Sequence, residues 1–349
     1  MSAKEVFLEK KGSLGLITLN RPEALNALTL NMVREIYPKL KLWAEDDEIL
    51  TVAVRAVGEK AFCAGGDIRA LYEWGKNGDE RATGFYYEEY LLNQVIKSFP
   101  KPYISFVNGI VMGGGVGLSV HGSHRIAGEN FSFAMPETGI GLFPDVGGSY
   151  FLSRLDNNAG MYLALTGSRL KAADSIYLGI AKYYIESKNY EEIINKLTQG
   201  ESPDDILKEY NTEPGISDFK NISEEIELLF SGNELEEIFM KLESKNSELS
   251  QKLYKTILTK SPTSLKISFK QIIDGKKNDF EECMRMEFRM VSRVMSDHDF
   301  YEGVRALIID KDNNPNWNPD DISKINEEDV ERFFTNLDDK ELNFNKGQI

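Results

Sequence analysis

Two glycine-rich turns are the segments of this sequence best suited to chemistry. The first spans residues 62–68 (FCAGGDI) and the second residues 112–117 (MGGGVG); each follows a strand-like stretch and precedes a helical one. Glycine lets a backbone approach a ligand closely, and amides at a helix start lack internal acceptors. Brought together, the two turns predict a pair of N–H donors for one developing oxyanion. Phosphate binding or simple tight turns fit the glycines equally well, although neither turn has a nucleotide-binding pattern.

Two carboxylates, Glu137 and Asp145, lie eight residues apart in an apolar and glycine-rich stretch, residues 133–149 (FAMPETGIGLFPDVGGS). A carboxylate in such surroundings is costly to bury unless it is paired or hydrogen-bonded. Partial desolvation would raise its pKa toward values useful in acid–base catalysis. The alternative interpretation makes Glu137 or Asp145 a helix cap or a structural partner for backbone amides.

A further carboxylate is expected on a helix over residues 79–98. Glu88 lies within the apolar stripe of that helix and Glu89 on its edge, so either could point inward. The helical wheel slightly favours Glu88. Two solvated glutamates remain the alternative.

Other reactive side chains have less support. His121 and His124 follow the second glycine turn, but no Ser or Cys in a nucleophile-elbow pattern accompanies them. Cys63 lies in the first turn, where a small buried cysteine is more common than a catalytic one. Cys63 and Cys283 have no metal-ligand spacing, so we expect no metal site and a reducing compartment.

The composition is that of a globular enzyme, with 349 residues, of which 41% are hydrophobic and 28% charged. The net charge of −15 argues against a nucleic-acid surface. No apolar run approaches the roughly 20 residues of a membrane span, and the first residues lack a secretory signal. We therefore expect a soluble intracellular protein without nucleic-acid or membrane partners.

Strand-like and helix-like segments alternate through the first part of the chain, which predicts an α/β fold with a mostly parallel sheet. Thr29 is the expected cap of the first long helix. We divide the chain into an α/β core, residues 1–186, and a helical C-terminal region, residues 187–349, that packs on it. That region should contain long helices over 256–273 and 280–295, and a polar, frayed tail from about residue 336.

Several of these segments together resemble a known family. Residues 20–28 (NRPEALNAL), 62–68 and 113–117 are similar to the crotonase (enoyl-CoA hydratase/isomerase) superfamily. Residues 135–138 (MPET), 143–148 (FPDVGG) and 298–306 (HDFYEGVRA) resemble its 3-hydroxyisobutyryl-CoA hydrolase branch. The similarity covers roughly residues 5 to 320. It implies a crotonase-like spiral of ββα units, with two roughly stacked sheets and a helical C-terminal region.

The resemblance assigns roles to particular residues. It makes the backbone amides of Gly66 and Gly114 the oxyanion hole. Hydratases carry one catalytic carboxylate at the position of Gly117 and a second at that of Glu137, so this sequence has lost the first and kept the second. Asp145 stands where hydratases usually have glycine and the hydrolase branch has aspartate. The resemblance therefore favours thioester hydrolysis over addition of water to a double bond.

The remaining expectations also come from the resemblance. Glu89, in preference to Glu88, becomes a substrate-binding residue, and Ala64, Ile68 and Arg69 are the expected neighbours of coenzyme A. The expected substrate is 3-hydroxyisobutyryl-CoA, with 3-hydroxypropionyl-CoA next, as in valine breakdown. Coenzyme A is part of this substrate and no separate cofactor is expected.

Two other functions remain open: an enoyl-CoA hydratase or isomerase of the same fold, and a non-catalytic acyl-CoA binder. The location would be cytoplasmic in a bacterium, or the mitochondrial matrix in a eukaryote after removal of a presequence. Trimers and hexamers are frequent in the superfamily, so a homo-oligomer is open as well, although the C-terminal region could cover the trimer surface.

Overall fold

Two β-sheets form the centre of the protein, whose computed structural model describes residues 4–346. The six-stranded sheet is parallel except for the antiparallel pair β1 and β2, and the four-stranded sheet is parallel except for β9. In spatial order the first contains β1 (Val6–Lys11), β2 (Leu14–Leu19), β3 (Thr51–Ala56), β5 (Tyr103–Val107), β7 (His124–Ala127) and β10 (Tyr183–Tyr184), and the second β4 (Ala61–Cys63), β6 (Ile110–Met112), β8 (Ser132–Ala134) and β9 (Leu170–Lys171). The predicted α/β class, with two sheets that are mostly parallel, is confirmed.

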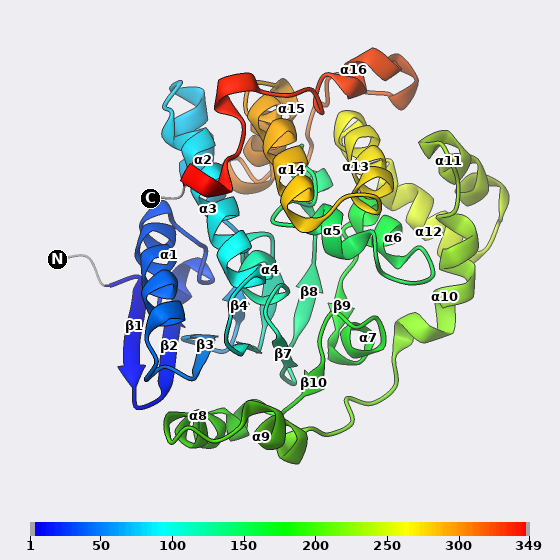
Figure 1. Ribbon diagram of the computed structural model, residues 1–349. Helices are drawn as coiled ribbons and strands as arrows, with labels where there is room; N and C mark the ends of the chain where they lie inside the picture. Colours follow the sequence, from blue (N-terminus) through cyan, green and yellow to red (C-terminus); the bar gives the residue numbers. More distant parts are fainter. Residues whose placement is uncertain (1–3, 347–349) are drawn as a thin grey trace.

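Helices that connect the strands cover these sheets (Figure 1). Thr29 caps the first, as predicted, since its hydroxyl accepts a hydrogen bond from the Met32 amide at 3.1 Å. In chain order these helices are α1 (Leu30–Glu45), α2 (Ile68–Lys76), α3 (Arg81–Lys97), α4 (Gly114–Ser119), α5 (Gly148–Leu152), α6 (Ala159–Thr166) and α7 (Ala172–Tyr177).

Beyond β10, every regular element in the described part of the chain is helical. The α-helices there are α8 (Tyr190–Thr198), α9 (Pro203–Tyr210), α10 (Asp218–Leu229), α11 (Leu235–Ser244), α12 (Glu248–Ile257), α13 (Pro262–Gly275), α14 (Phe280–Val294), α15 (His298–Val304) and α16 (Glu327–Glu331). The single helix predicted over 256–273 is wrong. Pro262 cannot continue a helix, and it begins α13 instead, behind the Ser261 cap.

The C-terminal segment packs against the rest of the protein. Figure 1 shows it beside α2 and α3, where the Tyr87 hydroxyl donates to the Asn343 carbonyl at 3.5 Å. Leu342 is buried, and Glu341 pairs with Arg289 at 2.7 Å. The predicted fraying from about residue 336 is therefore wrong, because the chain is packed as far as residue 345. Residues 347–349 lie outside the described chain.

One hydrophobic core runs from β1 to Leu342 and includes residues of both proposed regions. The division at residues 186 and 187 stays a prediction. Among the described residues, no helix is both long and apolar enough to cross a membrane.

Candidate active site

A pocket of about 220 Å³ lies between the two glycine turns, α3 and a π-helical turn, Arg305–Ile309. Seven residues predicted for the site line it: Ala64, Gly66, Ile68, Glu89, Gly114, Glu137 and Asp145. Leu307 and Ile308 close one side, so the C-terminal region contributes apolar surface to the pocket. Sequence reasoning did not identify these two residues.

The two glycine turns meet because β4 and β6, which precede them, are neighbouring parallel strands. Gly65 and Gly113 have φ values of 117° and 43°, a region that side chains disfavour. A Cβ placed on Gly114 would lie 3.4 Å from the Gly66 nitrogen, so the two amides are close neighbours.

Both amides are available to a ligand. The Gly114 N–H opens α4 and has no acceptor within that helix. The Gly66 N–H donates to no backbone carbonyl among residues 4–346. The geometry therefore allows two donors to reach one oxygen atom in the pocket, as an oxyanion hole requires.

Glu137 begins a short 3₁₀ helix, Glu137–Ile140, beside these turns, and is only 5% exposed. A Cβ on Gly113 would lie 3.3 Å from its Oε1, and its Oε2 has no hydrogen-bond partner. Burial, and then the nearby charge of Asp145, raise the pKa of Glu137 well above its ordinary value. An unpaired, desolvated carboxylate is suited to act as a base or a nucleophile.

Asp145 is buried in the same pocket. Its Oδ2 accepts a hydrogen bond from the Tyr90 hydroxyl at 3.1 Å. Burial raises the pKa of Asp145 to about 7, and the bond from Tyr90 opposes that rise. Asp145 can therefore change its charge near neutral pH.

Of the two helix glutamates, Glu89 lines the pocket and Glu88 does not. Glu89 is 2% exposed and its Oε1 has no hydrogen-bond partner. Burial, followed by the charge of Asp145, raises its pKa well above the ordinary value. Glu88 instead accepts two bonds, at 2.8 and 2.6 Å, from the Arg34 guanidinium. The preference of the helical wheel for Glu88 is wrong.

The wheel failed because the inner face of α3 is partly polar. Tyr86, Glu89, Tyr90 and Asn93 recur at the spacing i, i+3, i+4 and i+7 and are all buried. A wheel that ranks faces by apolar content places such residues at the edge of the stripe. Tyrosines flanking a glutamate at this spacing were the signal that could have identified Tyr86 and Tyr90.

The position of Gly117 has no room for the carboxylate that a hydratase carries there. A Cβ on Gly117 would lie 2.6 Å from Asn93 Nδ2 and 2.9 Å from Val146 Cβ. We predict that Gly117→Glu lowers the stability by about 1–3 kcal/mol through overpacking and produces no hydratase activity. Thermal unfolding and the absorbance of crotonyl-CoA measure the two effects, and a stable variant that hydrates crotonyl-CoA would contradict the prediction.

Helices of the C-terminal region hold the loop that carries both catalytic candidates. The Glu287 carboxylate on α14 accepts from the amides of Gly147 and Ser149 at 2.8 and 2.9 Å. The Gln271 side chain on α13 donates to the Pro144 carbonyl at 2.6 Å. These contacts surround Val146, whose φ of 52° is unusual for a β-branched residue. Glu287 and Gln271 are separated from the loop by more than 120 residues, and no sequence pattern linked them to it.

The histidine and cysteine near the site have structural surroundings. Burial raises the pKa of Cys63 to about 12, so the residue remains a thiol. Burial lowers the pKa of His121 to about 3, and its Nε2 lies 2.6 Å from the Val146 carbonyl oxygen. Neither is suited to act as a nucleophile or base in this pocket.

The buried acids predict how stability depends on pH. Burial raises the pKa of Asp145 from 3.8 to about 7 and that of Glu287 from 4.5 to about 8. Between pH 6.5 and 8 the unfolded chain has released these protons while the folded protein retains part of them. The free energy of unfolding should therefore fall as pH rises, by up to about 1.4 kcal/mol per pH unit for each acid.

Urea unfolding at pH 6.5, 7.2 and 8 measures this slope. The window begins at the ordinary pKa of 6.5 of His121 and His124, and burial lowers both pKa values, so these histidines oppose the slope at pH 6.5 and contribute little by pH 8. Glu287→Gln should make the fall of the unfolding free energy with pH shallower. A wild-type free energy of unfolding that rises from pH 6.5 to 8 would contradict the raised pKa values of the two acids.

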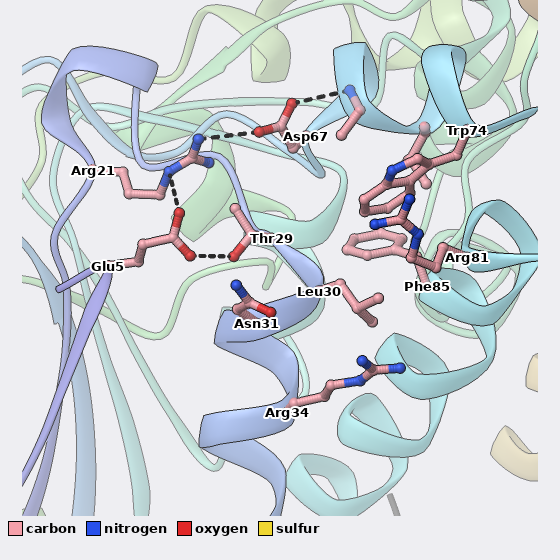
Figure 2. Close-up of a pocket in the computed structure, with 12 residues that line it drawn as sticks. Glu5, Arg21, Thr29, Leu30, Asn31, Arg34, Asp67, Trp74, Arg81 and Phe85 are labelled. Atoms are coloured by element: carbon pink, nitrogen blue, oxygen red, sulfur yellow. Dashed lines mark hydrogen bonds and ion pairs between the residues drawn. The ribbon is translucent and has the colours of Figure 1, made fainter. Parts of the chain in front are cut away.

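A second pocket of about 310 Å³ shares Leu71 and Phe85 of its lining with the first. Figure 2 shows Arg21 between Glu5 and Asp67, at 3.2 and 3.1 Å. The two other arginines that line it are also paired with carboxylates. Because its cations are already neutralised, we assign no ligand to this pocket.

The fold and the paired glycine turns define a class of acyl-CoA enzyme, and a family comparison agrees. A sequence profile of the enoyl-CoA hydratase/isomerase family matches residues 14–334, and the chain belongs to this family. It is 47% identical to the mitochondrial 3-hydroxyisobutyryl-CoA hydrolase of Danio rerio, over 98% of this chain and 93% of that protein. The Homo sapiens protein of the same name is 46% identical, over 98% and 92%. The predicted superfamily and branch are confirmed.

Solved structures resemble the fold over nearly its full length. A carnitinyl-CoA dehydratase from Mycobacterium thermoresistibile has a TM-score of 0.93 and 35% identity, with 98% of this chain and 99% of that chain covered. An enoyl-CoA hydratase from Rhodobacter sphaeroides 2.4.1 has a TM-score of 0.92 and 37% identity, with 97% and 100% covered. The names of these two structures refer to hydration or dehydration, whereas those of the sequence relatives refer to hydrolysis. The residues of the pocket must therefore be used to decide between the two reactions.

Proposed function

We propose that this protein hydrolyses 3-hydroxyisobutyryl-CoA to 3-hydroxyisobutyrate and coenzyme A. The observation that carries the proposal is the set of acids in the pocket. Glu137, Asp145 and Glu89 share it, whereas Asn93 and Val146 occupy the space of the additional hydratase carboxylate. The sequence relatives named 3-hydroxyisobutyryl-CoA hydrolase support the same activity.

In the proposed mechanism the thioester oxygen accepts hydrogen bonds from the Gly66 and Gly114 amides. Negative charge that develops on this oxygen is then stabilised by donors already in position. Glu137 either attacks the carbonyl carbon or removes a proton from a water that attacks it. In both routes the carbon–sulfur bond breaks, and coenzyme A leaves as a thiolate that takes up a proton. Direct attack gives an acyl–glutamyl anhydride, which water then hydrolyses.

Glu89 and Asp145 are the proposed partners of the substrate hydroxyl or of the hydrolytic water. A buried polar pocket of this kind should discriminate against acyl groups that lack the hydroxyl. The preferred substrate is 3-hydroxyisobutyryl-CoA, with 3-hydroxypropionyl-CoA next, which places the enzyme in valine breakdown. We propose no separate cofactor. Ala64 and Ile68, which line the pocket, are the proposed neighbours of the coenzyme.

Arg69 is a further proposed neighbour of the coenzyme. The Arg69 guanidinium donates to the Ile308 carbonyl at 3.2 Å, so it lies beside the pocket wall and near the expected path of the coenzyme. The mitochondrial relatives support a matrix location if the source is eukaryotic; in a bacterium the protein would be cytoplasmic.

Whether the protein forms a homo-oligomer stays a prediction.

One experiment separates the proposed activity from hydration. The purified protein is incubated with 3-hydroxyisobutyryl-CoA, 3-hydroxypropionyl-CoA and crotonyl-CoA, and thiol release and the absorbance of the conjugated double bond are both followed. A hydrolase releases thiol from the hydroxyacyl thioesters and leaves the crotonyl absorbance unchanged. Loss of that absorbance without thiol release would establish a hydratase instead. The names of the two solved structures refer to reactions of that kind. Binding without either reaction would leave an acyl-CoA binder.

A further inference from the structure

Tyr86 is a polar group of the pocket for which neither the proposed mechanism nor the fold provides a partner. It lines the pocket, is 2% exposed, and its hydroxyl makes no hydrogen bond within the described chain. Tyr90, one turn further along α3, differs because its hydroxyl donates to Asp145. A buried donor without an acceptor is destabilising and calls for an explanation.

The hydroxyl of Tyr86 remains a neutral donor at physiological pH. Burial raises its pKa well above 10, and the charges of Asp145, Glu89 and Glu137 raise it further. Tyr86 lines the same pocket as these three acids. Its ring packs edge-on against Phe85 and Tyr90, with centroid distances of 5.6 and 6.2 Å, which fixes its position.

The unpaired groups of the pocket are complementary to a hydroxyl. Tyr86 offers one donor, while Glu89 Oε1 and Glu137 Oε2 are acceptors without partners. A carbonyl oxygen can only accept, and the glycine amides already provide for the thioester oxygen. An alcohol both donates and accepts, so it can satisfy the phenol and one carboxylate at the same time.

We propose that Tyr86 determines specificity for hydroxylated acyl groups. Its hydroxyl donates a hydrogen bond to the oxygen of the substrate 3-hydroxyl, whose own hydrogen is accepted by a neighbouring carboxylate such as Glu89. This assignment rests on the proposed hydrolase function and adds a donor that does not depend on the protonation of the neighbouring acids.

The test compares two thioesters that differ only in the hydroxyl group. For wild type, Tyr86→Phe and Tyr87→Phe, kcat/KM is measured with 3-hydroxyisobutyryl-CoA and isobutyryl-CoA. Tyr86→Phe should lower kcat/KM for the hydroxylated substrate about 10- to 100-fold, the effect of one lost buried hydrogen bond. With isobutyryl-CoA it should remain within about twofold of wild type, because that substrate has no oxygen for the phenol to reach. Tyr87, which bonds to Asn343 outside the pocket, is the matched control and should change neither value.

Other outcomes would overturn the assignment. An equal fall with both substrates would mean that Tyr86 serves the common chemistry or the fold. No change with either would mean that the phenol is satisfied by a water and contributes nothing to selection. Thermal unfolding of Tyr86→Phe distinguishes loss of folding from loss of recognition.

A binding measurement keeps this test separate from that of the proposed function. Calorimetry uses the unreactive analogues of both thioesters in which a methylene group replaces the sulfur. If wild type prefers the hydroxylated analogue and Tyr86→Phe does not, the role of Tyr86 holds even if the protein releases no thiol. The opposite outcome is that wild type shows no preference for the hydroxylated analogue and none for the hydroxylated thioester. The role of Tyr86 in specificity is then wrong, whatever the rate of hydrolysis.

Discussion

Glu137→Gln should lower kcat for thiol release by about 10²–10⁴-fold, the contribution of a positioned base or nucleophile. The amide has nearly the shape of the carboxylate but cannot take a proton or form an anhydride. Affinity for the coenzyme A thioester should change little, because the glycine turns that hold the thioester are unaltered. Steady-state thiol release and calorimetry with the substrate measure the two quantities.

Glu88→Gln is the matched control for this loss. Glu88 lies on α3 next to Glu89 but is paired with Arg34 outside the pocket, so its variant should keep the wild-type rate. A Glu137→Gln protein that binds the thioester and releases thiol at the full rate would remove Glu137 from the mechanism. Hydroxylamine added during a single turnover of wild type distinguishes the two routes, since a hydroxamate on Glu137 would report direct attack.

Gly114→Ala should lower kcat by about 10²–10³-fold, comparable with the loss of one oxyanion donor. The added methyl group would lie 2.5 Å from Glu89 Oε1 and 3.4 Å from the Gly66 nitrogen. It would therefore displace Glu89 and intrude beside the two amides, where the thioester oxygen should bind. Thiol release with 3-hydroxyisobutyryl-CoA gives the rate, and circular dichroism tests whether the variant is folded.

Gly84→Ala is the control, because it adds the same methyl group at a position outside the pocket where there is room for it. Gly84 is in the interior of α3, and a Cβ there would meet no atom within 4 Å. We expect an unchanged rate and a gain of about 0.5–1 kcal/mol in stability, because alanine favours a helix over glycine. A folded Gly114→Ala protein with a rate within threefold of wild type would exclude the proposed oxyanion hole.

Local patterns predicted the elements that carry the site. Alternation of strands and helices gave the α/β class, and Thr29 marked the start of α1 correctly. The positive φ values of Gly65 and Gly113 explain why glycine recurs at the two turns. Such features depend on neighbouring residues and a few dihedral angles, so they can be recognised without the fold. The family motifs then assigned the acids of residues 133–149 to a particular chemistry.

Burial and long-range contacts decided the rest. The choice of Glu89 over Glu88 depends on the rotation of α3 against the core, and α3 turns a partly polar face inward. Tyr90 reaches Asp145 across 55 residues, and Glu287 reaches Ser149 across 138. No local pattern encodes contacts of this separation.

The sequence by itself determined which residues were available for chemistry: two glycine turns whose amides lack internal acceptors, and carboxylates in apolar surroundings. Only the tertiary structure decided that these residues share one pocket, because parallel pairing of β4 and β6 brings the turns to the same edge. It also decided their protonation, since the pKa of Asp145 rises to about 7 only when the packed chain removes it from water.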